Sequence, residues 1–280
     1  MIDLHMHTTA SDGRSTPVDL AARAIGLGLT TISVTDHDTV AAIAEVRAAA
    51  PSVRVISGIE ITAVADGRDV HMLAYFIDEH SPALAVFLER QRALRVDRVR
   101  EIARRLAALG APIDADRILV PAARHPGRSV GRPLLARALV DAGHVTTMQE
   151  AFDRYLAAGQ PAFVPRSGRS PRAVIRLIHE SGGVASFAHP GVTRRDDLLE
   201  PLAAEGLDAI EVFHSEHDRE AEARYLAIAT RLGLGVTGGS DYHGEIEGGY
   251  GRRVLGGTVL PARHLEDLEH RASGRAAARG

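Results

Sequence analysis

The chain alternates between short β-branched runs, which are typical of strands, and amphipathic segments with helical spacing, which are typical of helices. The helix expected at 16–29 has a Thr16 cap and Pro17 at its first position. Because this alternation is typical of parallel strands joined by crossover helices, we expect an α/β barrel-like domain. The expected strands are 1–4, 30–36, 53–62, 69–76, 183–188, 208–213 and 235–241. The expected helices of this type are 16–29, 39–50, 171–182, 195–206 and 218–233.

The spacing of apolar residues changes in the middle of the chain. Between Ser81 and Gly110 the apolar residues follow one long amphipathic helix, and further helical segments follow at 131–143 and 147–159. We therefore expect a barrel domain, 1–80 and 181–280, interrupted by a mostly helical insertion or cap domain, 81–180.

Composition narrows the possible chemistry. The 280 residues include no cysteine, which excludes disulfides, thiolate metal sites and cysteine nucleophiles, so any metal must be held by nitrogen and oxygen. The chain has no apolar run of membrane-spanning length and no signal-like start, so we expect a cytoplasmic protein that contacts no membrane. No feature of the chain indicates an obligate protein partner.

Charge is distributed unevenly, although the net charge is only −3. Residues 78–180 contain 17 arginines and 11 acidic residues, so the insertion is basic and its flanks are acidic. A solvated helix face is the simplest explanation for many of these arginines.

Residues that bind metals recur where the expected strands end. His5 and His7 are two apart at the end of the first strand, so both imidazoles face one side, and Asp241 and His243 repeat this geometry at the last strand. Active sites of parallel α/β barrels lie at the carboxyl ends of the strands. We therefore expect one polynuclear metal site at this rim. The nine candidate ligands are His5, His7, Asp12, His37, Glu60, His71, His189, Asp241 and His243.

His71 and the DHD motif around His37 fit the expected rim less simply than the other positions. His71 lies early in its strand, which fits the rim less well. In the DHD motif, Asp36 and Asp38 face away from His37 in an extended backbone. We therefore expect His37 to be the ligand and Asp36 or Asp38 to orient an imidazole N–H from behind the ligands.

Nine ligands suffice for two divalent ions and for three if water completes the coordination. Such a site is electropositive and favours anionic substrates, phosphate esters above all. Adjacent ions can generate a hydroxide near neutral pH and stabilise the attacking and leaving oxygens.

The motifs DLHMHTTASDG, SVTDHDT, GIEIT, FAHPG and GSDYHG follow one another over nearly the whole chain and resemble the metal-binding motifs of the polymerase and histidinol phosphatase (PHP) family. The resemblance implies a distorted (β/α)7 barrel, similar to a TIM barrel, with a trinuclear centre of Mn, Fe or Zn. It also implies how the ligands divide. One ion would take His5, His7, Glu60 and Asp241; a second would share Glu60 and add His71 and His189; a third would take Asp12, His37 and His243.

The insertion resembles the branch of this family that contains nucleoside 3',5'-bisphosphate phosphatases, AMP phosphoesterases and 5'-3' exoribonucleases. Leu134 occupies a position where that branch usually has histidine, which leaves the substrate contact open. We expect Arg132, with Arg128 or Arg124, to grip a substrate phosphate; the alternative is that Arg132 only caps or packs its helix. His214 and His217 are expected to line the pocket, with His217 near the leaving group or a phosphate.

We therefore expect a metal-dependent phosphatase that hydrolyses nucleotide phosphate monoesters with a hydroxide bridging two ions. Its substrate would be a small phosphorylated molecule, a nucleoside 3',5'-bisphosphate or AMP. The alternatives are a 5'-3' exoribonuclease on short RNA, which the aromatic content of 4% disfavours, a histidinol-phosphate phosphatase, and a metal- or nucleotide-binding module without catalysis. Catalysis is assigned to Glu60, Asp241, His189, Arg132 and His217.

Overall fold

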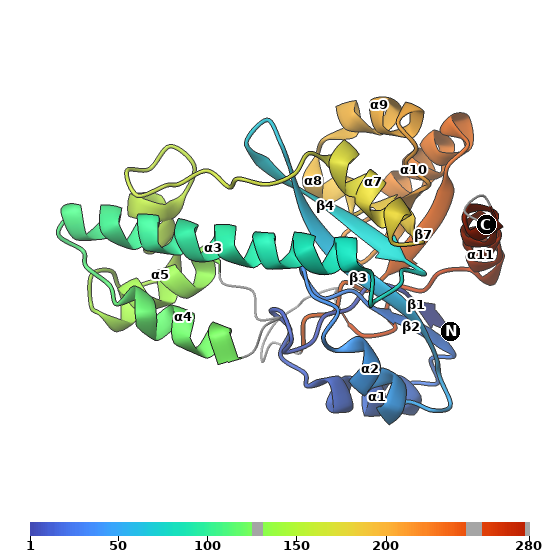
Figure 1. Cartoon of the computed structure of the whole chain (residues 1–280), viewed down its shortest axis with the longest axis horizontal. Coiled ribbons are helices and arrows are strands. Elements are labelled where there is room, and N and C mark those ends of the chain that lie inside the picture. The colour runs from blue at the N-terminus through green and yellow to red at the C-terminus, as the bar shows by residue number, and fades with distance from the viewer. Residues whose placement is uncertain (125–130, 245–253, 278–280) are drawn as a thin grey trace.

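A single seven-stranded sheet organises the chain. The computed structural model describes residues 1–124, 131–244 and 254–277. The strands lie in chain order and curl into a nearly closed barrel with helices around it, which confirms the expected α/β barrel (Figure 1). The strands are β1 (Ile2–Asp3), β2 (Thr31–Val34), β3 (Arg54–Ala65), β4 (Arg68–Tyr75), β5 (Val184–Phe187), β6 (Ala209–His214) and β7 (Gly235–Gly239).

Helices cover the barrel and build the insertion. The helices that follow or precede barrel strands are α1 (Pro17–Gly26), α2 (Ile43–Ala49), α7 (Pro171–Glu180), α8 (Pro190–Thr193), the 3-10 turn η2 (Asp196–Leu198), α9 (Leu199–Ala204), α10 (Arg219–Leu232) and α11 (Ala262–Ala277). The insertion contains α3 (Pro82–Ala108), α4 (Ala115–Arg124), α5 (Arg132–Asp141), α6 (Met148–Ala151) and the π-helical turn η1 (Phe152–Leu156).

The barrel closes where its first and last strands meet. The backbone N–H of Leu4 donates to the carbonyl of Gly238 at 3.2 Å, and that of Asp241 donates to the carbonyl of His5 at 2.8 Å. Gly239 makes this approach possible, because a Cβ at that position would lie 2.3 Å from the backbone nitrogen of His5. Closure therefore brings the two ends of the chain's motif series side by side.

One strand departs from the expected parallel arrangement. β4 runs antiparallel to both β3 and β5, so the expectation that all strands are parallel is wrong for this strand. The cause is a two-residue turn at Asp66 and Gly67, which both have positive φ (51° and 73°), as a tight hairpin requires. The reversal places the beginning of β4 at the rim where the parallel strands end.

α3 connects the barrel to the insertion. The first part of α3 packs in the barrel core through Leu84 and Phe87, whereas Ile102 and Leu106 lie in a separate apolar cluster with α4, α5 and α6. In Figure 1 the helix runs from the barrel out to this helical group, and the chain returns along an extended segment to α7. The boundaries at 81 and 180 stay a prediction. Within the described ranges, no helix combines the length and apolarity needed to cross a membrane.

Candidate metal centre

The ends of the barrel strands bring histidines and carboxylates together at one rim. β3 continues past its last pairing with β2, at Ser57, so that Glu60 stands at the end of the parallel sheet. His71 reaches the same place from the opposite direction, because β4 is antiparallel and pairs His71 with Thr62. The rim residues are His5 and His7 after β1, His37 after β2, Glu60 in β3, His71 in β4, His189 after β5, His214 at the end of β6, and Asp241 and His243 after β7.

Glu60 is the centre of this group and is almost completely buried, with 1% of its surface exposed. Its Oε1 lies 2.9 Å from Nδ1 of His71 and 3.0 Å from Nε2 of His189. Its Oε2 lies 3.1 Å from Nδ1 of His37 and 3.3 Å from Nε2 of His7. Nε2 of His5 also lies 3.4 Å from Oε2. One carboxylate thus faces five imidazoles, two at Oε1 and three at Oε2.

Asp241 is a second buried carboxylate beside Glu60. Its Oδ1 lies 3.2 Å from Nε2 of His7 and 3.3 Å from Nε2 of His5. Its Oδ2 lies 3.4 Å from Nε2 of His214. Asp241 and His189 both have positive φ, 51° and 27°, a strained conformation that non-glycine residues keep where the surrounding structure requires it. The backbone is therefore held in an unusual form at two of the rim positions.

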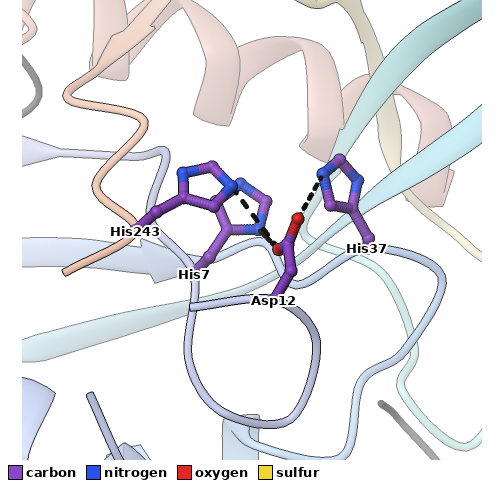
Figure 2. A group of neighbouring side chains, drawn as sticks. All are labelled: His7, Asp12, His37 and His243. Carbon is purple, nitrogen blue, oxygen red and sulfur yellow. Dashed lines mark ion pairs between the residues drawn. The ribbon is translucent and has the colours of Figure 1, made fainter. Parts of the chain in front are cut away.

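Asp12 closes the outer side of the rim, on the loop after β1. Its side chain is 44% exposed, and its Oδ1 lies 3.4 Å from Nε2 of His243. Oδ2 of Asp12 lies 3.7 Å from Nε2 of His37. Figure 2 shows the Asp12 carboxylate between the rings of His243, His7 and His37. The solvent-facing end of the group is therefore also a carboxylate among imidazoles.

The donor set fits divalent cations. Three groups have one ligand atom per residue within 4.8 Å of one another: His7 with Asp12, His37 and His243; His5 with His7 and Asp241; and His37 with Glu60 and His71. Both ring nitrogens of His7 and Nδ1 of His37 are buried without a hydrogen-bond partner in the described part of the chain. These nitrogens lie near carboxylate oxygens without forming hydrogen bonds, and a cation bound between imidazole and carboxylate would satisfy both groups.

The electrostatics agree with cation binding. Burial alone would raise the pKa of the Glu60 carboxyl, but the charges of His37 and His71 hold it well below its usual range. Burial likewise favours the neutral form of Asp241, yet His5 and hydrogen bonds from His214 and His7 keep its pKa low. Both carboxylates are therefore ionised at neutral pH and available as ligands.

A buried glutamate that the sequence reasoning missed supports this group from behind. Glu211 of β6 accepts a hydrogen bond from Nδ1–H of His5 at 2.9 Å and another from the backbone N–H of His189 at 2.7 Å. The available signal was a charged residue inside the apolar run DAIEVF. Glu211 fixes the tautomer and orientation of the His5 ring, which directs Nε2 toward Asp241 and Glu60.

The expectation that Asp36 or Asp38 orients an imidazole N–H is wrong for the described residues. Asp36 instead accepts hydrogen bonds from the backbone N–H and the hydroxyl of Thr8, both at 2.7 Å, and from Ser11 at 2.5 Å. It thereby fixes the loop that carries Asp12. Asp38 accepts from the backbone N–H of Thr62 at 2.9 Å and contacts the guanidinium of Arg95. The two aspartates position loops around the site.

The residues expected to contact substrate lie in two places. Arg132 donates to the backbone carbonyl of Leu156 at 3.3 Å, and its guanidinium carbon lies 5.5 Å from the centroid of the Phe163 ring, so the arginine is bound within the insertion. Arg124 ends α4, and its side chain is outside the described part of the structure, as is the whole of Arg128.

Of the two candidate pocket histidines, only His214 faces the carboxylate group, through Asp241. His217 donates from Nδ1 to the carbonyl of Val212 at 2.7 Å, and its Nε2 accepts from the backbone N–H of Gly191 at 3.1 Å. The ring of His217 is therefore held by backbone on both sides.

Known proteins are similar to this chain in sequence and, for a solved structure, in fold. The PHP domain profile matches residues 3–163. The 5'-3' exoribonuclease Rnm of Escherichia coli is 35% identical over 86% of this chain and 84% of its own. A 3',5'-nucleoside bisphosphate phosphatase of Chromobacterium violaceum is 33% identical over 95% and 92%. A solved structure from Bifidobacterium adolescentis, described as a proposed metal-dependent phosphoesterase, superposes with a TM-score of 0.81 at 34% identity over 96% of both chains.

Proposed function

The chain belongs to the PHP domain family and is a metal-dependent phosphoesterase, and on this basis we propose that its substrate is a phosphate monoester of a nucleotide, either a nucleoside 3',5'-bisphosphate or AMP. The similarity to the bisphosphate phosphatase, over 95% of this chain, supports the bisphosphate. The resemblance of the insertion to the branch that contains AMP phosphoesterases supports AMP. The buried carboxylates among imidazoles support the chemistry, because such a site can hold the cations that an anionic phosphate ester needs.

We assign the ligands of three ions, of manganese, iron or zinc, by combining the family motifs with the described geometry. The first ion would be held by His5, His7, Glu60 and Asp241, the second by Glu60, His71 and His189, and the third by Asp12, His37 and His243. Bound ions would activate water and neutralise charge on the phosphate.

The chain's own residues then position this chemistry. Glu60 is shared between two of the proposed ion sites, and its five imidazole neighbours fix both of its oxygens. Glu211 holds the His5 ring and the backbone of His189, and Asp36 holds the loop of Asp12. Arg132 as a phosphate contact stays a prediction. We do not carry His217 into the proposal, because backbone groups already occupy both of its ring nitrogens.

A substrate panel tests the proposal. Metal-loaded protein would be assayed for phosphate release from a nucleoside 3',5'-bisphosphate, AMP, histidinol phosphate and 5'-phosphorylated short RNA. We expect the two nucleotides to be the best substrates. Glu60→Gln is expected to lower turnover by about 100-fold or more, because a neutral amide cannot replace the shared carboxylate. Glu45→Gln, an exposed position on α2, is the matched control. Normal turnover by Glu60→Gln would refute the assigned site.

The similarity to the E. coli exoribonuclease, over 86% of this chain, favours a second candidate, stepwise hydrolysis of short RNA from its 5' end. Gel electrophoresis of a 5'-phosphorylated RNA oligomer separates the two activities. A monoesterase leaves the oligomer at its original length, whereas an exoribonuclease shortens it.

A further inference from the structure

His214, the last residue of β6, takes no part in the proposed ligand set, although its side chain is completely buried beside the ligands. Its ring centroid lies 5.4 Å from that of His189 and 6.2 Å from that of His5. Among the described residues, it belongs to none of the three groups whose donor atoms could hold a cation. A buried imidazole inside the metal centre therefore has no role in the proposed function.

The backbone fixes which nitrogen of this ring carries the hydrogen. Nδ1 of His214 accepts a hydrogen bond from the backbone N–H of Glu216 at 3.1 Å. Because a backbone N–H can only donate, Nδ1 must offer its lone pair, and the neutral ring carries its hydrogen on Nε2. His214 therefore presents an N–H donor to the metal centre and has no ring lone pair left for a cation.

That donor meets one oxygen of a proposed ligand. Nε2 of His214 lies 3.4 Å from Oδ2 of Asp241, within hydrogen-bond distance. The other oxygen of this carboxylate, Oδ1, lies 3.3 Å from Nε2 of His5 and 3.2 Å from Nε2 of His7, the two histidines proposed for the same ion. The two oxygens of Asp241 thus have different neighbours, a hydrogen-bond donor at Oδ2 and proposed metal ligands at Oδ1.

The turn after β6 holds the His214 ring in place. The backbone N–H of His217 donates to the carbonyl of His214 at 2.9 Å, and Nδ1–H of His217 donates to the carbonyl of Val212 at 2.7 Å. Nε2 of His217 accepts from the backbone N–H of Gly191, two residues after His189, at 3.1 Å. This approach requires glycine, because a Cβ at Gly191 would lie 2.8 Å from Nε2 of His217. The backbone around the His214 ring therefore fixes the direction of its donor.

We propose that His214 is a positioning residue that orients the Asp241 carboxylate, so that Oδ1 is the oxygen offered to the divalent cation. A hydrogen bond from Nε2–H to Oδ2 fixes the rotation of the carboxylate and occupies the second oxygen. The proposal rests on the proposed function, because it assumes that Asp241 binds a cation. Loss of the donor should therefore weaken metal binding without removing a ligand.

Metal affinity in two His214 variants tests this role. In His214→Met the side chain keeps a similar volume but loses the donor, whereas in His214→Gln an amide N–H can reach the position of Nε2. We expect His214→Met to bind manganese about 10- to 100-fold more weakly, measured by competition with a chelator, and His214→Gln to recover most of that affinity. His270→Met, at an exposed position on α11, is the matched control. Equal affinities of His214→Met and the wild-type protein, or equal losses in both His214 variants, would overturn the proposal.

Two further measurements separate positioning from a general structural role. The visible absorption spectrum of cobalt-loaded protein reports the coordination of the ion, and we expect it to change in His214→Met and to match the wild-type spectrum in His214→Gln. In an Asp241→Asn background the affinity cost of His214→Met should shrink, because the carboxylate through which His214 acts is gone. An unchanged cobalt spectrum in His214→Met, or a cost of the same size in both backgrounds, would overturn the role.

The test does not depend on one variant or on a substrate. If His214→Met does not fold, His214→Asn, whose amide ends near the position of Nδ1, also removes the Nε2 donor and gives the same comparison with His214→Gln. Because these readouts need no substrate, they decide the role of His214 even if the protein hydrolyses none of the proposed nucleotides. Wild-type protein that binds no divalent cation would overturn the role together with the metal centre.

Discussion

Glu211 offers the sharpest test of how the chain prepares the metal centre. Its two oxygens accept hydrogen bonds from two different rim residues, Nδ1–H of His5 at 2.9 Å and the backbone N–H of His189 at 2.7 Å. In Glu211→Gln one oxygen becomes an amide NH2, which cannot accept from either donor. One buried N–H thus loses its acceptor. The substitution also removes the negative charge that favours metal binding by the His5 ring.

The size of the effect follows from this geometry. Leaving one buried donor unsatisfied costs about 1–3 kcal/mol. Loss of a carboxylate behind a metal-binding histidine typically weakens metal affinity about 10- to 100-fold. We therefore expect the affinity of Glu211→Gln for manganese or zinc to fall about 10- to 100-fold. Its activity should be low at limiting metal and should recover when excess metal is added.

Competition with a chromophoric chelator measures the affinity directly. Melting temperatures with and without metal separate weaker binding from a damaged fold. A damaged fold lowers the melting temperature of the metal-free protein, whereas weaker binding reduces only the increase that added metal produces. Glu266→Gln, an exposed position on α11, is the matched control. Unchanged metal affinity in Glu211→Gln would refute the role assigned to Glu211.

Two further predictions concern the scaffold. Burial alone would raise the pKa of Asp208, but hydrogen bonds from His179, the Ala185 N–H and Arg275 lower it, so its stabilising effect is present at neutral pH and lost as the pH falls through the lowered pKa. Asp208→Asn should therefore lower the free energy of unfolding by about 2 kcal/mol at pH 7. In urea titrations, the difference in this free energy between the wild-type protein and the variant should shrink below about pH 4. An equal difference at pH 7 and below about pH 4 would contradict this. Gly239→Ala should destabilise the protein by about 1–3 kcal/mol and weaken metal binding, because its Cβ would meet the His5 backbone at 2.3 Å. Gly26→Ala, with open space around its Cβ, is the control in the same urea titration, and equal stability of the two variants would argue against the closure described at Gly239.

The residues of the rim could be predicted from the sequence because their positions along the chain, at the ends of the expected strands, determine where they lie in a barrel. Parallel strands end at one edge of a barrel, so residues such as His37 and His189, which follow apolar runs, converge without any knowledge of packing. The same-side spacing of His5 and His7 needed only the alternation of side chains along a strand. Their assignment to individual ions remains a proposal.

Other features depended on information that single runs of sequence do not contain. The DG pair at Asp66 and Gly67 signals a tight hairpin, but only the pairing of β4 with both neighbours shows that His71 enters the rim from the opposite direction. Asp36 binds Thr8 across 28 positions of sequence, a partner fixed by tertiary packing. Asp241, which has positive φ, donates its backbone N–H to the carbonyl of His5 across 236 positions of sequence, a contact that only the closed barrel supplies.

The central claim is that the carboxylates and imidazoles of one rim hold several divalent cations. Elemental analysis of protein purified after growth with ample manganese, iron and zinc, combined with a crystal structure of the same sample, tests it most directly. We predict two or three ions per chain, with one ion in contact with both Glu60 and a histidine of the rim. Protein that contains no divalent metal, with these side chains paired only to one another, would contradict the account.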